Sequence, residues 1–374
     1  MRLLYVANGY TTHDRRFLEA LSRDQFEVHY LRLTSVTLDR RPLPAGVVPI
    51  PWVGDRLAAG AMFGNVRRWL ELRRVVRDLR TSVALAGPVP TAAFLLALTG
   101  FGPFVAMSWG SDLLVDARQS RVGGAKAAYA LRRAAGFFGD CQAVADEARR
   151  LAPLADDRVV LFPWGIDHNQ FFAGPPSLTL RRELGWEDKR VVICTRSWEP
   201  VYAVDVLVRA FAAAAPEFAD ARLLLLGDGS QATDIQKLIG RMDVRDRVHA
   251  PGRIGYDSLP EYFRLADVYA SSALSDGSSV SLLEAMACGL PAIVTGAFGN
   301  LEWVRPGENG WLAEPGSVES LAGCLREALA APADRLAEIG RVNAAVARER
   351  ADWDRNFPRL SELLQRVADK GRRT

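Results

Sequence analysis

Short apolar runs recur along this chain, and segments whose apolar residues have helical spacing separate them. The runs are LLYVA (3–7), VALAG (83–87), PFVAMSWG (103–110), VVLFP (159–163), VVICT (191–195), LLLLG (223–227), VYASSA (268–273) and PAIVT (291–295). Strands that are apolar throughout and alternate with helices form parallel sheets covered on both faces. The pattern therefore predicts an α/β fold.

The runs form two series, one up to about Phe162 and one from about Val191 to Leu329. The loop-rich segment PWGIDHNQFFAGPP (163–176) separates them and is the expected interdomain linker. A chain of 374 residues also exceeds the size at which a single hydrophobic core stops growing. We therefore predict two α/β domains, at 1–165 and 166–350, and a helix at 351–374 that packs back on the first domain.

Composition narrows the class of protein further. Charged residues make up 24% and apolar residues 49%, which is typical of a folded globular chain. The N-terminus MRLLYVANGY reads as a strand and not as a secretory signal, so we expect a cytoplasmic protein. The cysteines lack metal-ligand spacing, and we expect free thiols at Cys141, Cys194, Cys288 and Cys324.

The segment SDGSSVSLLEAMACGLPAIVT (275–295) carries the clearest functional pattern. Ser278 or Ser279 is positioned to cap a helix that ends near Gly289, so Asp276 lies at the helix entrance and Glu284 about two turns in. The free N–H groups of a helix N-terminus bind phosphate oxygens. Gly277 would let a ligand approach the backbone closely.

The two acidic residues also have simpler interpretations. Asp276 alone would be read as a capping residue and Glu284 alone as an exposed helix position. However, Glu284 is flanked by Leu282, Leu283, Ala285 and Met286, so its carboxylate is expected to be partly buried and to need polar partners. Ribose hydroxyls would be such partners.

This segment resembles the signature of retaining glycosyltransferases of family 4, which have the GT-B architecture of two Rossmann-like domains facing across a cleft. The resemblance implies that the N–H groups of Ser279 and Val280 hold the donor diphosphate, that Asp276 contacts the sugar and that Glu284 holds the ribose. The family more often has Glu where this chain has Asp276, so its sugar contacts are expected to differ.

Further positions follow the family's order. Arg196, in TRSWEPVYAVDVLVRAF (195–211), matches the arginine that meets the diphosphate, but the lysine that usually follows is missing and Tyr202 lies in that region. Arg253 and Ile254 match the segment beside the nucleotide base. The simpler interpretation of Arg196 is a surface ion pair, and that of Arg253 and Ile254 is an ordinary loop.

The first domain supplies one donor-binding candidate, Gly9, and several acceptor-side candidates. Gly9, in NGYTTHDRRFLEAL (8–21), stands where the family has a glycine-rich turn, and His13 follows it. SWGSDLL (108–114) resembles the family's HGxD turn, with Trp109 in place of the histidine and with Ser111 and Asp112 as cleft-wall candidates. A solvated His13 and a simply packed Trp109 are the alternatives.

A basic amphipathic helix is predicted at NVRRWLELRRVVRDLR (65–80). Its apolar stripe would comprise Val66, Trp69, Leu70, Val75, Val76 and Leu79, with arginines elsewhere. Such a helix packs on a core with a solvated charged face, or it meets anionic lipid headgroups at the inner face of the membrane.

The resemblance implies retaining transfer of a sugar from a nucleotide diphosphate sugar to a sugar, lipid-linked or other hydroxyl acceptor, with neither a metal nor another cofactor. No nucleic acid partner is expected. The Asp352-Trp353-Asp354 triplet lies far in sequence from every phosphate candidate, so we do not expect it to be a metal site. A nucleotide-sugar epimerase or isomerase and a non-catalytic nucleotide-sugar binding protein remain alternatives. A nicotinamide dehydrogenase is disfavoured, because no predicted strand is followed by the dinucleotide-binding motif GxGxxG.

Overall fold

The computed structural model describes residues 1–52 and 62–371, with side chains from residue 69 onward in the second range. The chain divides into two compact units, one of Met1–Phe162 with Asp354–Thr374 and one of Pro163–Trp353. The last helix, α14 (Trp353–Gly371), therefore belongs almost wholly to the first unit. Within that unit the hydroxyl of Ser361 donates a hydrogen bond to the carboxylate of Asp24.

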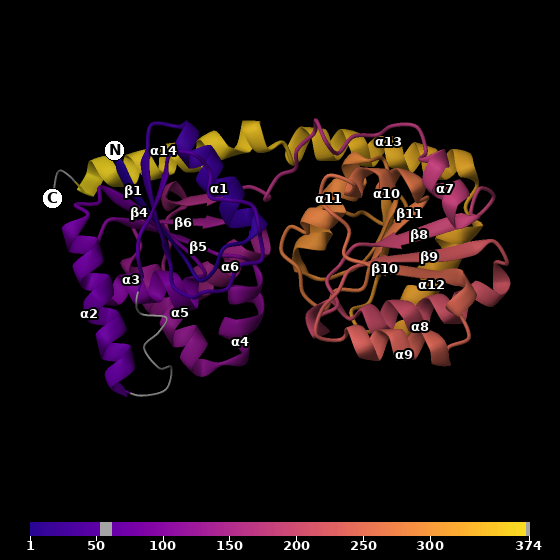
Figure 1. Ribbon diagram of the computed structural model, residues 1–374, viewed down its shortest axis with the longest axis horizontal. Coiled ribbons are helices and arrows are strands. Elements are labelled where there is room, and N and C mark those ends of the chain that lie inside the picture. The colour runs from indigo at the N-terminus through magenta and orange to yellow at the C-terminus, as the bar shows by residue number, and fades with distance from the viewer. Residues whose placement is uncertain (53–61, 372–374) are drawn as a thin grey trace. The chain divides into compact units, whose positions relative to one another are not determined.

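The first unit is built on a parallel sheet with the strand order β3-β2-β1-β4-β5-β6-β7 (Figure 1). Its strands are β1 Arg2–Ala7, β2 Glu27–Arg32, β3 Val47–Pro49, β4 Val83–Ala86, β5 Phe104–Met107, β6 Gly136–Gly139 and β7 Val159–Leu161. Its helices, besides α14, are α1 Thr12–Arg23, α2 Met62–Asp78, α3 Phe94–Leu98, α4 Ala117–Gln119, α5 Arg121–Arg133 and α6 Gln142–Leu151.

The second unit has its own parallel sheet, with the order β10-β9-β8-β11-β12-β13. Its strands are β8 Arg190–Cys194, β9 Ala221–Leu226, β10 Val248–Gly252, β11 Val268–Ser271, β12 Ala292–Thr295 and β13 Gly310–Ala313. Its helices are α7 Leu178–Leu184, α8 Val204–Ala214, α9 Ala232–Arg241, α10 Leu259–Leu265, α11 Val280–Ala287, α12 Val318–Ala330 and α13 Ala333–Arg350.

Both faces of the second sheet are buried, because alternate side chains of a strand point to opposite faces. Val192 and Cys194 of β8 pack with α8, α9 and α12 on one face. Val191 and Ile193 pack with α10, α11 and α13 on the other. In Figure 1 the two groups of helices lie on opposite sides of this sheet. The continuous apolar runs of the sequence follow from this two-sided burial.

Every apolar run identified in the sequence contains a strand, so the predicted α/β fold is confirmed. Strands β2, β3, β6, β10 and β13 were not among the runs. The segment NGWLA contains β13. The four cysteines are free thiols, as expected. Within the described residues, no helix combines the length and the apolarity needed to cross a membrane.

The predicted amphipathic helix exists as α2, but its apolar stripe differs in one member. Leu72 and Val76 are buried, and the indole Nε1 of Trp69 donates to the carbonyl of Leu98 at 2.9 Å. Leu70 is 52% exposed, so placing it on the buried stripe was wrong. Val66 lies outside the residues whose side chains are described. Arg73, Arg74, Arg77 and Arg80 are exposed, which gives α2 a basic outer face.

Helices α11 and α13 meet where two glycines face each other. Gly289 ends the α11 turn with φ +82°, a left-handed conformation that favours glycine. A Cβ added to Gly340, in the interior of α13, would collide with the backbone carbonyl of Gly289. Only a glycine at 340 therefore lets α13 pack this closely against the helix that carries Glu284.

We expect Gly340→Ala to lower the free energy of unfolding by about 1–3 kcal/mol, because the added methyl group meets backbone that cannot rotate away. Gly323→Ala is the matched control, since Gly323 lies inside α12 and a Cβ there meets no atom within 4 Å. That variant should be neutral or more stable by up to about 1 kcal/mol. Urea unfolding followed by circular dichroism measures both, and equal stabilities would contradict the packing argument.

Candidate active site

Two loops of the second unit meet at the point where the strand order reverses. The chain builds the sheet from β8 outward through β9 to β10, and then from β11 outward on the other side. Arg196 follows β8, and residues 276–279 follow β11. Open α/β sheets bind ligands at such a switch point, outside the carboxyl ends of the strands.

Arg196 links these two loops. Its Nη2 lies 3.0 Å from Oδ2 of Asp276, and its Nη1 donates to the hydroxyls of Ser279 at 2.7 Å and Ser281 at 3.1 Å. The guanidinium also lies over the ring of Tyr202, 4.0 Å from its centroid. Arg196 is only 8% exposed, so the pair with Asp276 is shielded from water. The arrangement is a buried ion pair and not a surface one.

Burial and charge oppose each other at this pair. Burial raises the pKa of the Asp276 carboxyl, and the positive charge of Arg196 partly counters that rise. Burial lowers the pKa of Arg196, but the negative charge of Asp276 and the smaller contributions of Tyr202, Tyr269 and Cys194 together outweigh it, so the guanidinium stays protonated. A fixed positive charge therefore lies at the switch point.

The start of α11 lies beside this charge. Ser279 occupies the N-cap position, as predicted, but its side chain makes no capping hydrogen bond and accepts instead from Arg196. The N–H groups of the first turn are thus left without a side-chain cap. A helix N-terminus of this kind attracts anions, and here the guanidinium next to it adds to the attraction.

Several polar atoms around the pair are buried and lack a hydrogen-bond partner within the part of the chain that the structure describes. They include Nε of Arg196, Oγ1 of Thr195 and Oγ of Ser275. An unpaired buried polar group costs free energy, whereas a ligand that bonds to it recovers that cost. These groups suit a ligand rich in acceptor and donor oxygens, such as a phosphorylated sugar.

Glu284 lies in the interior of α11 and is 3% exposed. The sequence predicted partial burial for this carboxylate, and the structure places it deeper. Gly277 is approached by the chain itself, because a Cβ on Gly299 would collide with the Gly277 carbonyl. The Gly299 N–H also donates to the Asp276 carbonyl at 3.1 Å.

The GDGS loop (227–230) supports the Arg196 loop by direct backbone contact. A Cβ on Gly227 would collide with the carbonyl of Arg196, and one on Gly229 would collide with the carbonyl of Trp198. The glycines are required because two loops pack main chain against main chain.

Arg253 and Ile254 directly follow β10 at the same end of the sheet. Arg253 is exposed. The hydrogen bonds from Ser230 are the main cause of the lowered pKa of Glu199, and the charge of Arg253 adds to this effect. Ile254 packs against the buried cluster instead of standing free. The sequence analysis did not identify Glu199 and Ser281, which lie beside the predicted residues. The signal that could have pointed to them was their position inside the 195–211 and 275–295 segments.

In the first unit, Asp112 holds a turn together. Its Oδ1 accepts from the Ser108 hydroxyl at 2.6 Å and from the Trp109 N–H at 2.8 Å, and its Oδ2 accepts from the Val89 N–H at 2.8 Å. Burial raises its pKa to about 6 against these hydrogen bonds. Asp112 therefore positions the β4 and β5 loops, while Ser111 beside it is exposed.

His13 and Trp109 come together although they are far apart in sequence. Their rings lie 5.9 Å apart at 46°, and His13 is half-buried instead of solvated. Gly9 has a close packing role, since a Cβ there would lie 2.8 Å from the Val36 carbonyl. Its own carbonyl accepts from the Tyr30 hydroxyl at 2.5 Å.

Comparison of sequences shows what the second unit is similar to. Residues 177–343, which include Arg196, Asp276 and Glu284, match the family Glycosyl transferases group 1. The chain is 28% identical over 210 residues to GDP-mannose-dependent alpha-(1-6)-phosphatidylinositol monomannoside mannosyltransferase of Mycolicibacterium smegmatis, covering 54% of this chain and 55% of the relative. The chain thus spans about half the length of the curated relatives it matches. The predicted family resemblance is confirmed.

Comparison of structures extends over the whole chain. Anabaena Alr3699/HepE, solved in complex with UDP-glucose, matches with a TM-score of 0.77 and 20% identity over 100% of both chains. Sucrose-phosphate synthase from Thermosynechococcus elongatus matches with a TM-score of 0.82 and 16% identity over 98% of this chain and 99% of its own. At these identities the likeness shows the fold, and it confirms the predicted GT-B architecture.

We expect Arg196→Met to lower the free energy of unfolding by about 3–5 kcal/mol, because it leaves the Asp276 carboxylate buried without a counter-charge. The double variant Arg196→Met with Asp276→Asn removes that isolated charge and should recover most of the loss. Chemical denaturation of the wild type, both single variants and the double variant measures the coupling. Additive effects would show that the two charges do not depend on each other.

We also expect His13 to contribute to the pH dependence of folding stability, with stability lost in acid. Burial, aided by the charge of Arg16, lowers its pKa from the ordinary 6.5 to about 4. Between these values the unfolded chain binds the proton more tightly, so this contribution to stability is present at pH 7 and lost as the pH falls toward 4.

Between pH 7 and 4.5, the wild type should lose about 2 kcal/mol more stability than His13→Gln. An NMR titration of the imidazole resonances, with His13→Gln for assignment, checks the pKa directly. Titration of the His13 ring near 6.5 would contradict its burial.

Proposed function

We propose that this chain, whose residues 177–343 belong to the group 1 glycosyl transferases, transfers a sugar from a nucleoside diphosphate sugar to an acceptor hydroxyl. The observation that carries the proposal is the junction of Arg196, the first turn of α11 and Asp276 at the switch point of the second sheet. The fixed positive charge at this junction would stabilise a departing diphosphate, which supports the proposal.

The diphosphate would bind by exchange. Its oxygens would compete with the hydroxyls of Ser279 and Ser281 for Nη1 of Arg196, and would accept from the N–H groups near Ser279 and Val280. The guanidinium and the helix terminus would together neutralise the charge that builds up as the sugar–phosphate bond breaks. We propose that the reaction needs no metal ion, since these two groups provide that neutralisation.

Asp276 and Glu284 would divide the remaining tasks. Glu284, buried in α11, would accept hydrogen bonds from the ribose hydroxyls of the donor, and Asp276 would hold the transferred sugar. We propose retention of configuration: the acceptor oxygen bonds to the anomeric carbon on the face from which the diphosphate leaves. The acceptor proton passes to an oxygen of the leaving phosphate, so no protein base is required.

The acceptor side belongs to the first unit in this proposal, with His13 and Trp109 as its aromatic residues. A relative named for phosphatidylinositol monomannoside supports a lipid-linked acceptor in glycolipid or glycan biosynthesis. The exposed arginines of α2 fit the headgroups of an anionic membrane. We therefore propose a cytoplasmic protein that works at the inner membrane face.

We expect Glu284→Gln to reduce kcat/KM by about 10- to 100-fold, because an amide accepts ribose hydrogen bonds more weakly than a carboxylate. Glu327→Gln, at an exposed position of α12, is the matched control and should keep full activity. A coupled assay of nucleoside diphosphate release, run with a panel of nucleotide sugars and acceptors, measures both. Equal activity of the two variants would remove Glu284 from the site.

The same assay separates the alternatives. A transferase releases nucleoside diphosphate only when an acceptor is present, whereas an epimerase or isomerase converts the donor without one. A non-catalytic binding protein is stabilised by the donor in a thermal shift measurement but shows no turnover, whichever acceptor is added.

A further inference from the structure

A cavity of about 500 Å³ lies in the first unit, beside the ends of β1 and β2. Its lining runs from Tyr10, just after β1, through Tyr30 and Arg32 of β2 to Trp52. This size is typical of small-molecule sites. None of its lining residues was among the site residues predicted from the sequence.

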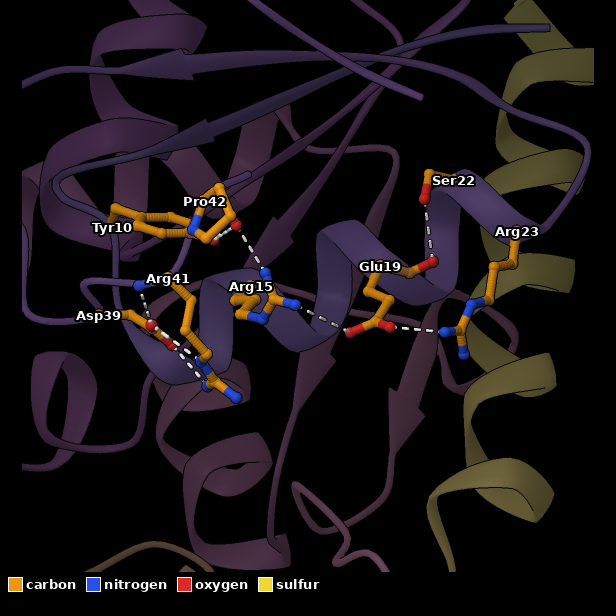
Figure 2. A network of polar contacts seen from close by, with 8 residues as sticks. All are labelled: Tyr10, Arg15, Glu19, Ser22, Arg23, Asp39, Arg41 and Pro42. Atoms are coloured by element: carbon orange, nitrogen blue, oxygen red, sulfur yellow. Dashed lines mark hydrogen bonds and ion pairs between the residues drawn. The ribbon is translucent and has the colours of Figure 1, made fainter. Parts of the chain in front are cut away.

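The wall of the cavity is fastened to α1 and to the end of β1. The carbonyl of Pro42 accepts from Nη1 of Arg15 at 2.6 Å and from the Tyr10 hydroxyl at 3.2 Å (Figure 2). The backbone N–H of Leu38 donates to the Tyr10 carbonyl at 2.8 Å. Figure 2 shows these contacts holding the 39–42 segment against α1. The cavity is therefore formed in advance of any ligand.

The charge of the lining is unbalanced. Among the described lining residues the one acidic group is Asp39, which is paired with Arg41, whose Nε and Nη2 reach the two carboxylate oxygens at 3.0 and 2.6 Å (Figure 2). Arg32 instead donates to a neutral group, the Thr37 hydroxyl, at 2.6 Å. Arg40 is exposed and makes no ion pair with any carboxylate that the structure describes. Among the residues that the structure describes, these two guanidinium groups of the cavity lining thus have no counter-charge.

The remaining lining suits a polar ring. Tyr10 and Tyr30 stand with ring centroids 6.0 Å apart, and the indole of Trp52 is held by its hydrogen bond to the Leu33 carbonyl at 3.0 Å. Thr34 adds a hydroxyl to the lining. Aromatic faces pack against the apolar faces of sugar or cyclitol rings, and guanidinium groups bind phosphate oxygens with paired donors.

We propose that this cavity binds the phosphate ester of a phosphorylated sugar or cyclitol acceptor, with Arg32 and Arg40 as its phosphate ligands. The proposal deepens the acceptor side of the proposed transfer and rests on it. The same phosphate chemistry occurs in a free sugar phosphate and in a glycolipid headgroup, so the test separates these two sources.

Isothermal titration calorimetry with inositol monophosphate, and with inositol as the uncharged comparison, tests the soluble source. We expect the wild type to bind the phosphate and not the parent cyclitol. Arg32→Gln with Arg40→Gln should weaken binding by about tenfold or more, because two charge-assisted contacts are lost. Arg121→Gln, an exposed arginine of α5, should bind as the wild type does.

Co-sedimentation with phosphatidylcholine vesicles, with and without phosphatidylinositol, tests the lipid source. A loss confined to the vesicle arm in the double variant assigns the site to a headgroup, and a loss confined to the soluble arm assigns it to a free sugar phosphate. Binding of neither probe by the wild type, or equal binding by the wild type and the double variant in both arms, overturns the proposal.

The nucleotide site provides an independent readout. Thermal stabilisation by UDP or GDP should be the same in the wild type and the double variant, because Arg196 lies in the other unit. If these nucleotides stabilise the protein while neither phosphate probe binds, the cavity proposal fails and the transferase proposal stands. If the phosphate probe binds as expected while no nucleotide or nucleotide sugar binds, the transferase proposal fails.

Discussion

Two-sided burial of parallel strands is the constraint on which the rest of this molecule depends. With Val191 and Ile193 packed on one face of the second sheet and Val192 and Cys194 on the other, the faces have no room for polar chemistry. Polar groups from different strands can converge only where the strands end. The Arg196 site and the arginine-lined cavity both lie at such ends, each in its own unit.

At the switch point one guanidinium does most of the organising. Arg196 joins the loop after β8 to the loop after β11 and to the start of α11, and the ring of Tyr202 covers it. The hydroxyl of Ser279, which would otherwise cap α11, is used by Arg196, so the helix N-terminus stays available to an anion. In the proposed function, a bound diphosphate would therefore replace the hydrogen bonds of Arg196 to the two serine hydroxyls, and it would add new ones at the N–H groups of the first turn.

The sequence predicted the parts of the fold in which burial dictates composition. Continuous apolar runs marked the central strands, but β2, with the alternating EVHYLR, and β6, with GFFG, were missed because neither is an unbroken apolar run. The resemblance to the family's motifs pointed to Arg196, Asp276 and Glu284. It did not reveal the direct Arg196–Asp276 contact, since the pairing of two loops depends on strand order. Asp112 shows the same limit: the resemblance suggested a cleft wall, and it did not reveal the three hydrogen bonds with which Asp112 holds its turn together.

The glycines at the contacts between loops determine which parts of the site can be changed by substitution. Gly227 and Gly229 rest on the carbonyls of Arg196 and Trp198, and Gly299 rests on the carbonyl of Gly277, so main-chain contacts fix how these loops pack. Side chains on the loops can then be exchanged without moving the main chain. A glutamate in place of Asp276 would change the reach of one carboxylate and leave these main-chain contacts as they are.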